Sequence, residues 1–176
     1  METPLCNFCL KSGILCQKCQ KKVESGQVGE TDIRIARLLM KLEGKYPPLQ
    51  KIVFYNAYEI DDVLAIVVGK GNLSAFLGGD GKIMREIADN SNKKIRIIEK
   101  QGDMRKFLED LFAPAAITTI NKIWLPDGTT ETRVILPNRP RRMPLKTKVL
   151  KELAKNIRGI TLRIAFEDQM EKIIRE

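Results

Sequence analysis

One order of secondary-structure patterns occurs twice along this chain of 176 residues. From residue 31, apolar spacing predicts a helix, two strands, a short helix, a glycine loop, a third helix and a strand. A helix, two strands, a helix and a strand are predicted again from residue 103 onward. The order recurs after roughly 70 residues, which indicates an internal repeat. The repeat predicts an α+β protein with two small domains of similar architecture.

The first predicted helix begins at a cap formed by Thr31 or Asp32 and ends at Gly44. The other predicted helices span residues 73–77, 82–90, 104–111, 145–153 and 167–176. The predicted strands span residues 49–55, 63–68, 94–98, 116–124, 129–136 and 160–166. We therefore expect three segments: a cysteine-containing module with a linker (1–29), a first domain (30–100) and a second domain (101–176).

A glycine-rich loop, Gly78-Gly79-Asp80-Gly81, separates the two later helices of the first copy. A loop without side chains at its glycines lets a phosphodiester backbone approach its amides and the positive end of the next helix. The tetrad alone also matches an ordinary turn, but the elements around it favour a nucleic-acid clamp. Lys70, Lys82 and Arg85 are the predicted basic contacts, with solvent-facing helix residues as the alternative interpretation.

The second copy replaces this loop with residues 137–144, which contain three prolines and no glycine. Proline lacks an amide donor, so the segment cannot bind a phosphate through its main chain as the first loop can. Arg139, Arg141 and Arg142 can still attract a phosphate through their side chains. Two interpretations stay open, a second RNA contact built from side chains or a degenerate domain kept for stability or protein docking.

All four cysteines lie within the first 19 residues, as Cys6-x2-Cys9 and Cys16-x2-Cys19. Each pair can present two thiolates to one ion, and the doubled spacing favours a structural zinc site with four cysteine ligands. Two disulfides, a redox-active pair or an iron–sulfur cluster are the alternatives. A site with four thiolates has no open position for catalysis, so we expect zinc to fold a small knuckle or ribbon.

Composition limits the classes of function. The formal net charge of +9 favours a polyanionic partner, and the last third of the chain carries the largest excess. The chain has no histidine and no evident catalytic arrangement, so we expect no enzymatic activity and no small-molecule substrate. No apolar run approaches the roughly 20 residues of a membrane span, which predicts a soluble cytoplasmic protein with no membrane partner.

Several stretches of the sequence resemble the type II K-homology (KH) domains that occur in pairs in NusA-like transcription factors of archaea. Residues 67–71, 77–82 and 93–99 look like parts of the first domain of this family. Residues 109–114 and 124–129 look like the start of the second domain. The resemblance covers residues 31–166, and the N-terminal segment with four cysteines is similar to that of some longer archaeal members.

The resemblance implies RNA binding linked to transcription elongation or termination, without catalysis. In KH domains, a G-x-x-G loop holds about four nucleotides of single-stranded RNA. Carried over by position, Gly78 to Gly81 match this clamp, and Lys82 and Arg85 lie on the helix after it. Asp80 departs from the family pattern, in which this position often carries a basic or small residue, and its carboxylate would repel a phosphate.

The sequence therefore predicts a non-enzymatic factor that binds single-stranded RNA and acts on RNA polymerase. The alternative is a docking module for a polymerase, a ribosome or another ribonucleoprotein complex, with incidental RNA contact. Few residues are aromatic, at 6%, so base recognition would rely on aliphatic packing more than on stacked rings.

Overall fold

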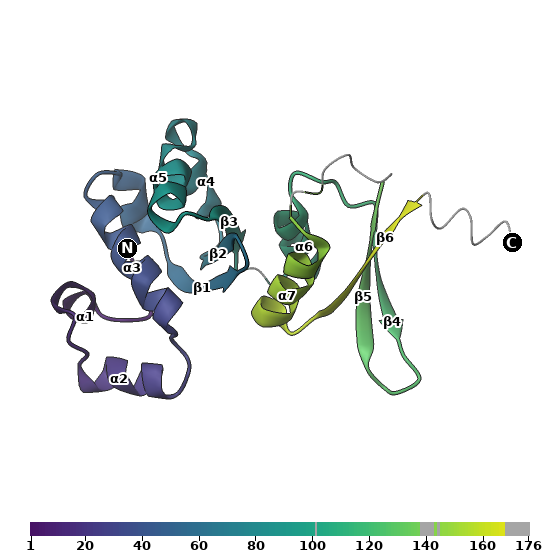
Figure 1. Cartoon of the computed structure of the whole chain (residues 1–176), viewed down its shortest axis with the longest axis horizontal. Helices are drawn as coiled ribbons and strands as arrows, with labels where there is room; N and C mark the ends of the chain where they lie inside the picture. Colours follow the sequence, from purple (N-terminus) through teal and green to yellow (C-terminus); the bar gives the residue numbers. More distant parts are fainter. Residues whose placement is uncertain (101, 138–142, 144, 168–176) are drawn as a thin grey trace, which may run out of the picture. The chain divides into compact units, whose positions relative to one another are not determined.

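The structure is a computed structural model that describes residues 1–100, 102–137, 143 and 145–167 (Figure 1). Contacts divide the chain into two compact units, Met1–Gly102 and Asp103–Glu176. Each unit contains helices and one three-stranded sheet, so the predicted mixed α+β class is confirmed. Within the described residues, no helix is both long enough and apolar enough to cross a membrane.

The sheet of unit 1 has the strand order β1-β2-β3. Strands β1 (Phe54–Ile60) and β2 (Val63–Val68) are antiparallel, whereas β3 (Lys94–Glu99) runs parallel to β2. Every residue of β2 is buried, which explains why its sequence is an unbroken apolar run. The central strand therefore anchors the core of unit 1.

Three helices pack with this sheet: α3 (Glu30–Glu43), α4 (Leu73–Leu77) and α5 (Lys82–Ser91). Each contributes apolar side chains to one hydrophobic cluster with the sheet. The largest fully buried side chains of this cluster include Ile35, Leu39, Phe54, Leu64, Phe76 and Ile87.

The cysteine-containing segment packs onto the same cluster. It forms α1 (Asn7–Ser12) and α2 (Gln17–Glu24), joined by a turn at Gly13, whose φ is 80°. Buried side chains from this segment are Leu5, Cys9, Leu10 and Cys19. Residues as early as Leu5 therefore belong to the core of unit 1.

Unit 2 repeats the sheet of unit 1 in strand order and direction. Strands β4 (Thr119–Trp124) and β5 (Thr130–Leu136) are antiparallel, and β6 (Thr161–Phe166) runs parallel to β5. Helices α6 (Met104–Phe112) and α7 (Thr147–Arg158) supply most of its fully buried side chains. The two sheets therefore share one strand order and one pattern of strand directions.

Two details of the first copy differ from the sequence prediction. The strand predicted at residues 49–55 is wrong over its first half, because Pro47–Lys51 form a 3-10 helix and β1 begins at Phe54. Proline at positions 47 and 48 fixes φ and supplies no amide hydrogen, which favours a helical turn over a paired strand. Leu49 is fully buried in this turn, so its apolar character reflects packing.

The start of α3 also differs from the prediction, because Gly29 is its N-cap residue. Asp32 lies at the third helical position, where its carboxylate accepts the Gly29 amide at 2.7 Å. The same carboxylate accepts the amide of Ala57 on β1 at 2.5 Å. Asp32 thus joins the helix to the sheet edge, and its burial is compensated by hydrogen bonds. The helix predicted at residues 167–176 lies almost wholly outside the described residues.

Candidate nucleic-acid interface and cysteine cluster

The glycine loop connects α4 to α5 at one end of unit 1 (Figure 1). Its residues Gly79, Asp80 and Gly81 have φ values of 63°, 58° and 71°. Glycine adopts this left-handed conformation freely, and aspartate tolerates it better than most other residues. The sequence Gly-Asp-Gly therefore matches three successive left-handed positions before α5 begins at Lys82.

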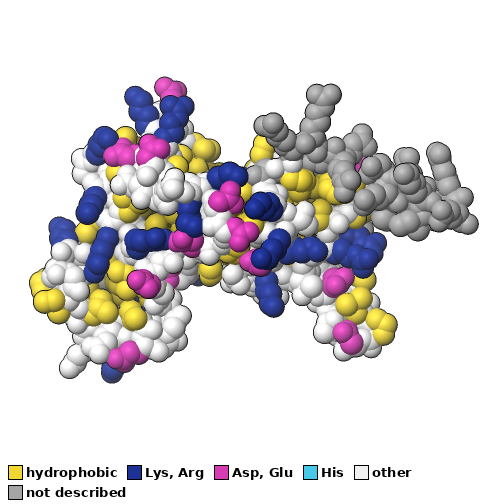
Figure 2. Space-filling view, viewed as in Figure 1, with side chains coloured by type: hydrophobic (Ala, Val, Ile, Leu, Met, Phe, Trp, Pro, Cys, Tyr) yellow, Lys and Arg dark blue, Asp and Glu magenta, His cyan; other side chains and the backbone are white. Residues whose placement is uncertain are grey.

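Free space surrounds this loop. A Cβ atom built at Gly79 or Gly81 would meet no atom within 4 Å, and one at Gly78 would meet only the Ser74 carbonyl at 3.6 Å. Figure 2 shows Lys and Arg side chains, with acidic ones near them, at the end of unit 1 where α4 and α5 meet. The loop is therefore accessible to a ligand within its own unit.

Helix α5 presents Lys82 and Arg85 to solvent. Ile83 and Ile87 bury the opposite face of the helix, which leaves the two basic residues, three positions apart, exposed together. No side chain caps the start of α5, where Gly81 is the N-cap residue. The positive end of the helix dipole and two cations therefore lie next to the loop.

Glu86 holds α5 against the segment that follows α3. Its carboxylate accepts hydrogen bonds from Lys45 at 2.7 Å and from the Tyr46 hydroxyl at 2.6 Å. The Lys45 bond, followed by the Tyr46 bond, lowers the pKa of Glu86 below its ordinary value. These contacts fix the rotation of α5 and so keep Lys82 and Arg85 outward.

Lys70 lies at the other end of α4, in a turn between Gly69 and Gly71. Gly69 allows the Asn72 side chain to pack against the main chain, because a Cβ atom at position 69 would lie only 2.8 Å from Asn72 Oδ1. The α4 helix separates Lys70 from the glycine loop by about 7.5 Å of helical rise. The structure thus gathers Lys82 and Arg85 at the loop and places Lys70 beyond α4.

Leu77 is a further candidate contact that the sequence interpretation did not name. It immediately precedes the glycines, and its side chain is 58% exposed, whereas Phe76 beside it is fully buried. An exposed aliphatic side chain next to a backbone clamp can pack against a base. The signal in the sequence was two adjacent apolar residues on a short helix, of which only one can face the core.

The arginines of the second copy, Arg139, Arg141 and Arg142, lie outside the described residues. Their proposed contact with RNA stays a prediction from the sequence.

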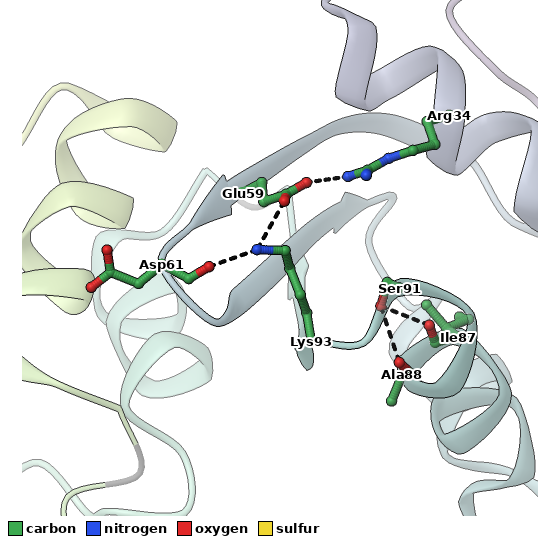
Figure 3. A network of polar contacts seen from close by, with 7 residues as sticks. All are labelled: Arg34, Glu59, Asp61, Ile87, Ala88, Ser91 and Lys93. Atoms are coloured by element: carbon green, nitrogen blue, oxygen red, sulfur yellow. Dashed lines mark hydrogen bonds and ion pairs between the residues drawn. The ribbon is translucent and has the colours of Figure 1, made fainter.

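A polar network stabilises the end of the sheet away from the glycine loop (Figure 3). Glu59 on β1 accepts hydrogen bonds from Arg34 on α3 and from Lys93, whose Nζ lies 2.8 Å from the carboxylate. Lys93 also donates to the Asp61 carbonyl at 2.6 Å. The Lys93 bond is the main reason that the pKa of Glu59 lies below its ordinary value. Lys93 therefore has a structural role.

The four cysteines converge at the starts of α1 and α2. Cys6 and Cys16 are the N-cap residues of the two helices, and Cys9 and Cys19 are at the third helical positions. Their four Sγ atoms lie within 4.8 Å of one another. Cys9 and Cys19 are buried, whereas Cys6 and Cys16 are exposed.

Backbone amides donate to two of the sulfur atoms. The Cys16 amide lies 3.1 Å from Cys9 Sγ, and the Cys6 amide lies 3.4 Å from Cys19 Sγ. Each helix start thus donates to a sulfur of the other pair. The Cys19 amide lowers the pKa of Cys16 to about 7. The Cys16 amide also acts to lower the pKa of Cys9, but the Cys6 sulfur and burial outweigh it and raise that pKa to about 12.

This donor set fits a thiophilic metal ion. A zinc ion with four sulfur ligands at about 2.3 Å requires sulfur atoms roughly 3.8 Å apart. Cys6 Sγ lies 3.8 Å from Cys19 Sγ, at that spacing, and 3.2 Å from Cys9 Sγ, which is closer than a bound zinc ion would set. The four cysteines can therefore hold one metal ion, and each C-x2-C pair supplies one sulfur from an N-cap residue and one from the third position of the helix.

Comparison with known proteins adds a distant sequence similarity. No protein-family model matches the chain. It is 27% identical over 97 residues to a protein of Methanococcus vannielii described as "Probable transcription termination protein NusA", covering 55% of this chain and 53% of that protein. A Methanocaldococcus jannaschii protein with the same description is 27% identical over 82 residues, covering 47% and 44%. The chain spans about half the length of these curated relatives.

A solved structure shares the fold. The crystal structure of APE1850 superposes with a TM-score of 0.56 at 14% sequence identity, covering 75% of this chain and 96% of that one. The chain is therefore similar in fold to a solved protein and distantly similar in sequence to archaeal proteins described as NusA.

Proposed function

We propose that this protein is a non-enzymatic factor that binds single-stranded RNA and takes part in transcription elongation or termination. The observation that carries the proposal is the open Gly79-Asp80-Gly81 backbone leading directly into α5. The sequence similarity to archaeal proteins described as probable transcription termination protein NusA supports the link to transcription. RNA polymerase or another ribonucleoprotein complex is the proposed assembly in which the protein acts.

We infer that both units are KH domains and that only unit 1 keeps the main-chain clamp. Both sheets have one antiparallel and one parallel pair around a central strand, which supports a common origin. The clamp would bind a phosphodiester at the loop amides and the start of α5, with Lys82 and Arg85 as charged contacts. Leu77 is the proposed aliphatic neighbour of a base.

The cysteine cluster supports a structural zinc ion in this proposal. Cys6, Cys9, Cys16 and Cys19 would hold the ion, which leaves no ligand position for a substrate. When bound, zinc supplies folding free energy to a segment with few apolar residues. The cysteine side chains fix α1 and α2 on the core of unit 1, and no catalytic step is assigned to them.

Titration of the zinc-loaded full chain with a short fluorescent oligouridine tests the proposal. Gly79→Asp adds a carboxylate and a side chain at the open loop, and we expect it to weaken RNA binding by about tenfold. Gly128→Asp is the matched control, because Gly128 also has a positive φ, 82°, but lies in the β4–β5 turn of unit 2. Equal affinities for the two variants would refute the clamp.

A further inference from the structure

A groove on unit 1 lies beside α3. Its helical wall carries Arg34, Arg37 and Lys41, which lie on one side of α3 because their spacing is i, i+3, i+7. Its other wall includes Gly13 and Leu15 from the turn between α1 and α2. This open groove has a volume of about 860 Å³, enough for several side chains of a ligand.

A second hollow of about 500 Å³ continues this groove along α1. Gly13, Arg37 and Lys41 line both spaces, and Lys11 and Met40 are added on the α1 side. The two together are called the α3 groove, bounded by the residues lining either hollow. It is formed mainly by α3 and the cysteine-containing segment, with Glu59 of β1 and Asn90 of α5 also lining it, and all of these belong to unit 1.

The α3 groove has an excess of positive charge. Its basic residues are Lys11, Arg34, Arg37 and Lys41, and its acidic residues are Glu30 and Glu59. Glu59 is already paired with Arg34 and Lys93, so it does not compensate the remaining cations. In the described part of the chain, no ion pair involves Lys11, Arg37 or Lys41.

Arg37 is the most buried of the unpaired basic residues of the groove. Its Nε is buried and has no hydrogen-bond partner among the described residues. A buried donor without a partner is unfavourable, and a carboxylate that pairs with the guanidinium improves its electrostatic environment. The residue lies in the middle of the groove, since it lines both hollows.

Aliphatic side chains lie between these charges. Leu15, Ile33 and Leu38 are half-buried along the groove, and Ile14 beside it is 72% exposed. Figure 2 shows an apolar patch next to basic side chains over α1 and α3. An exposed apolar patch rimmed by charge is typical of a site for protein interaction.

These features favour a peptide over a nucleic acid. None of the residues that line the α3 groove is aromatic, so bases would find no ring on which to stack. Glu30 and Glu59 would repel a continuous row of phosphates, whereas a peptide can space its carboxylates to avoid them. We propose that the α3 groove docks a segment of a partner protein in which acidic residues alternate with aliphatic ones, an inference that goes beyond RNA binding at the glycine loop.

Selection from a random peptide library displayed on phage tests this inference with the zinc-loaded full chain. We expect enriched peptides to be rich in Asp, Glu, Leu, Ile and Val. The affinity of one enriched synthetic peptide is then measured by fluorescence anisotropy. The double variant Lys11→Glu and Lys41→Glu should weaken its binding by about tenfold, because it reverses two charges at the groove.

Lys51→Glu is the matched control, since Lys51 is exposed on unit 1 but lies outside the α3 groove. It should leave peptide binding unchanged, and circular dichroism should show that all variants stay folded. An enriched set without acidic residues, or equal binding by the double variant, would overturn the proposal. The proposal would also be overturned if the phage library yielded no enriched peptide and the double variant lost oligouridine binding. That result would assign the groove to RNA. Loop variants such as Gly79→Asp test RNA binding separately.

Discussion

The backbone amide of Cys16 lies 3.1 Å from Sγ of Cys9, so the start of α2 donates a hydrogen bond to a sulfur of α1. The Cys6 amide does the same for Cys19 at 3.4 Å. These two hydrogen bonds link α1 to α2 without the help of a metal ion. Each amide favours the ionised form of the thiol that it contacts, but the Cys6 sulfur and burial outweigh this effect at Cys9, whose pKa is raised to about 12.

The first prediction concerns Cys9→Ser. We expect the purified wild type to contain about one zinc per chain and the variant to lose it, because the variant lacks one of four thiolates. The lost ion and the altered core position should raise amide hydrogen exchange in residues 5–28, while unit 2 keeps its protection. Ser12→Ala, also in α1, should retain the metal. Zinc retained by Cys9→Ser would show that the cluster is not the site.

The second prediction concerns the charge at the loop. Asp80→Asn removes a carboxylate from the proposed phosphate contact and keeps a residue type that tolerates the left-handed conformation. Loss of the repulsion should strengthen oligouridine binding by roughly fivefold at low salt, a change that corresponds to about 1 kcal/mol. Asp61→Asn is the control, because Asp61 also has a positive φ, 51°, in another turn. Anisotropy titrations that gave the same gain for both variants would remove Asp80 from the site.

The third prediction concerns Glu59, the acceptor in Figure 3. Glu59→Gln should lower the free energy of unfolding at pH 7 by about 1 kcal/mol, since Arg34 and Lys93 lose their partner. The pKa of Glu59 is lowered in the folded state, so its contribution is present above the ordinary value of 4.5 and is lost as the pH falls through the lower folded pKa.

Chemical denaturation at several pH values checks this prediction. The stability difference between wild type and Glu59→Gln should close in acid. Glu131→Gln is the control, since Glu131 lies 3.8 Å from an exposed arginine and should matter less. A difference that stayed constant from pH 7 to acid would contradict the assigned cause.

The fourth prediction concerns the core of unit 2. Leu153 on α7 is fully buried, so Leu153→Ala should destabilise this unit by about 2–5 kcal/mol. Hydrogen exchange should increase in residues 103–166 and change little in residues 30–100, because the two units have separate internal contacts. Lys151→Ala, an exposed change on the same helix, serves as the control. Equal increases in both units would show that they unfold together.

Local sequence patterns predicted most of the fold because most elements combine a characteristic spacing of apolar residues with a residue that marks where the element ends. The apolar run of β2 identified this strand, and Gly44 marked the end of α3. The strand expected at residues 49–55 was partly wrong because Leu49 is apolar for packing in a 3-10 turn after two prolines. From the sequence alone, an apolar residue that follows proline fits a strand and a 3-10 turn equally well.

The candidate site was predictable where backbone conformation dictates the residue type. Glycine and aspartate at positions 79–81 match left-handed φ values, and the doubled C-x2-C spacing matches a cluster of four sulfur atoms. Contacts between distant segments were not predictable. The pairing of Glu86 with Tyr46 and the groove between Gly13 and Arg37 depend on how α3 packs, which no short pattern encodes.

The central claim is that RNA lies against the open main chain around Asp80. Crosslinking a short oligoribonucleotide that carries 4-thiouridine to the zinc-loaded protein, followed by mass spectrometry of the modified peptides, tests it most directly. Our account predicts that the modified residues lie at Leu77 to Arg85, and that Gly79→Asp strongly reduces this modification. Crosslinks confined to unit 2 or to the α3 groove, with residues 77–85 unmodified, would contradict it.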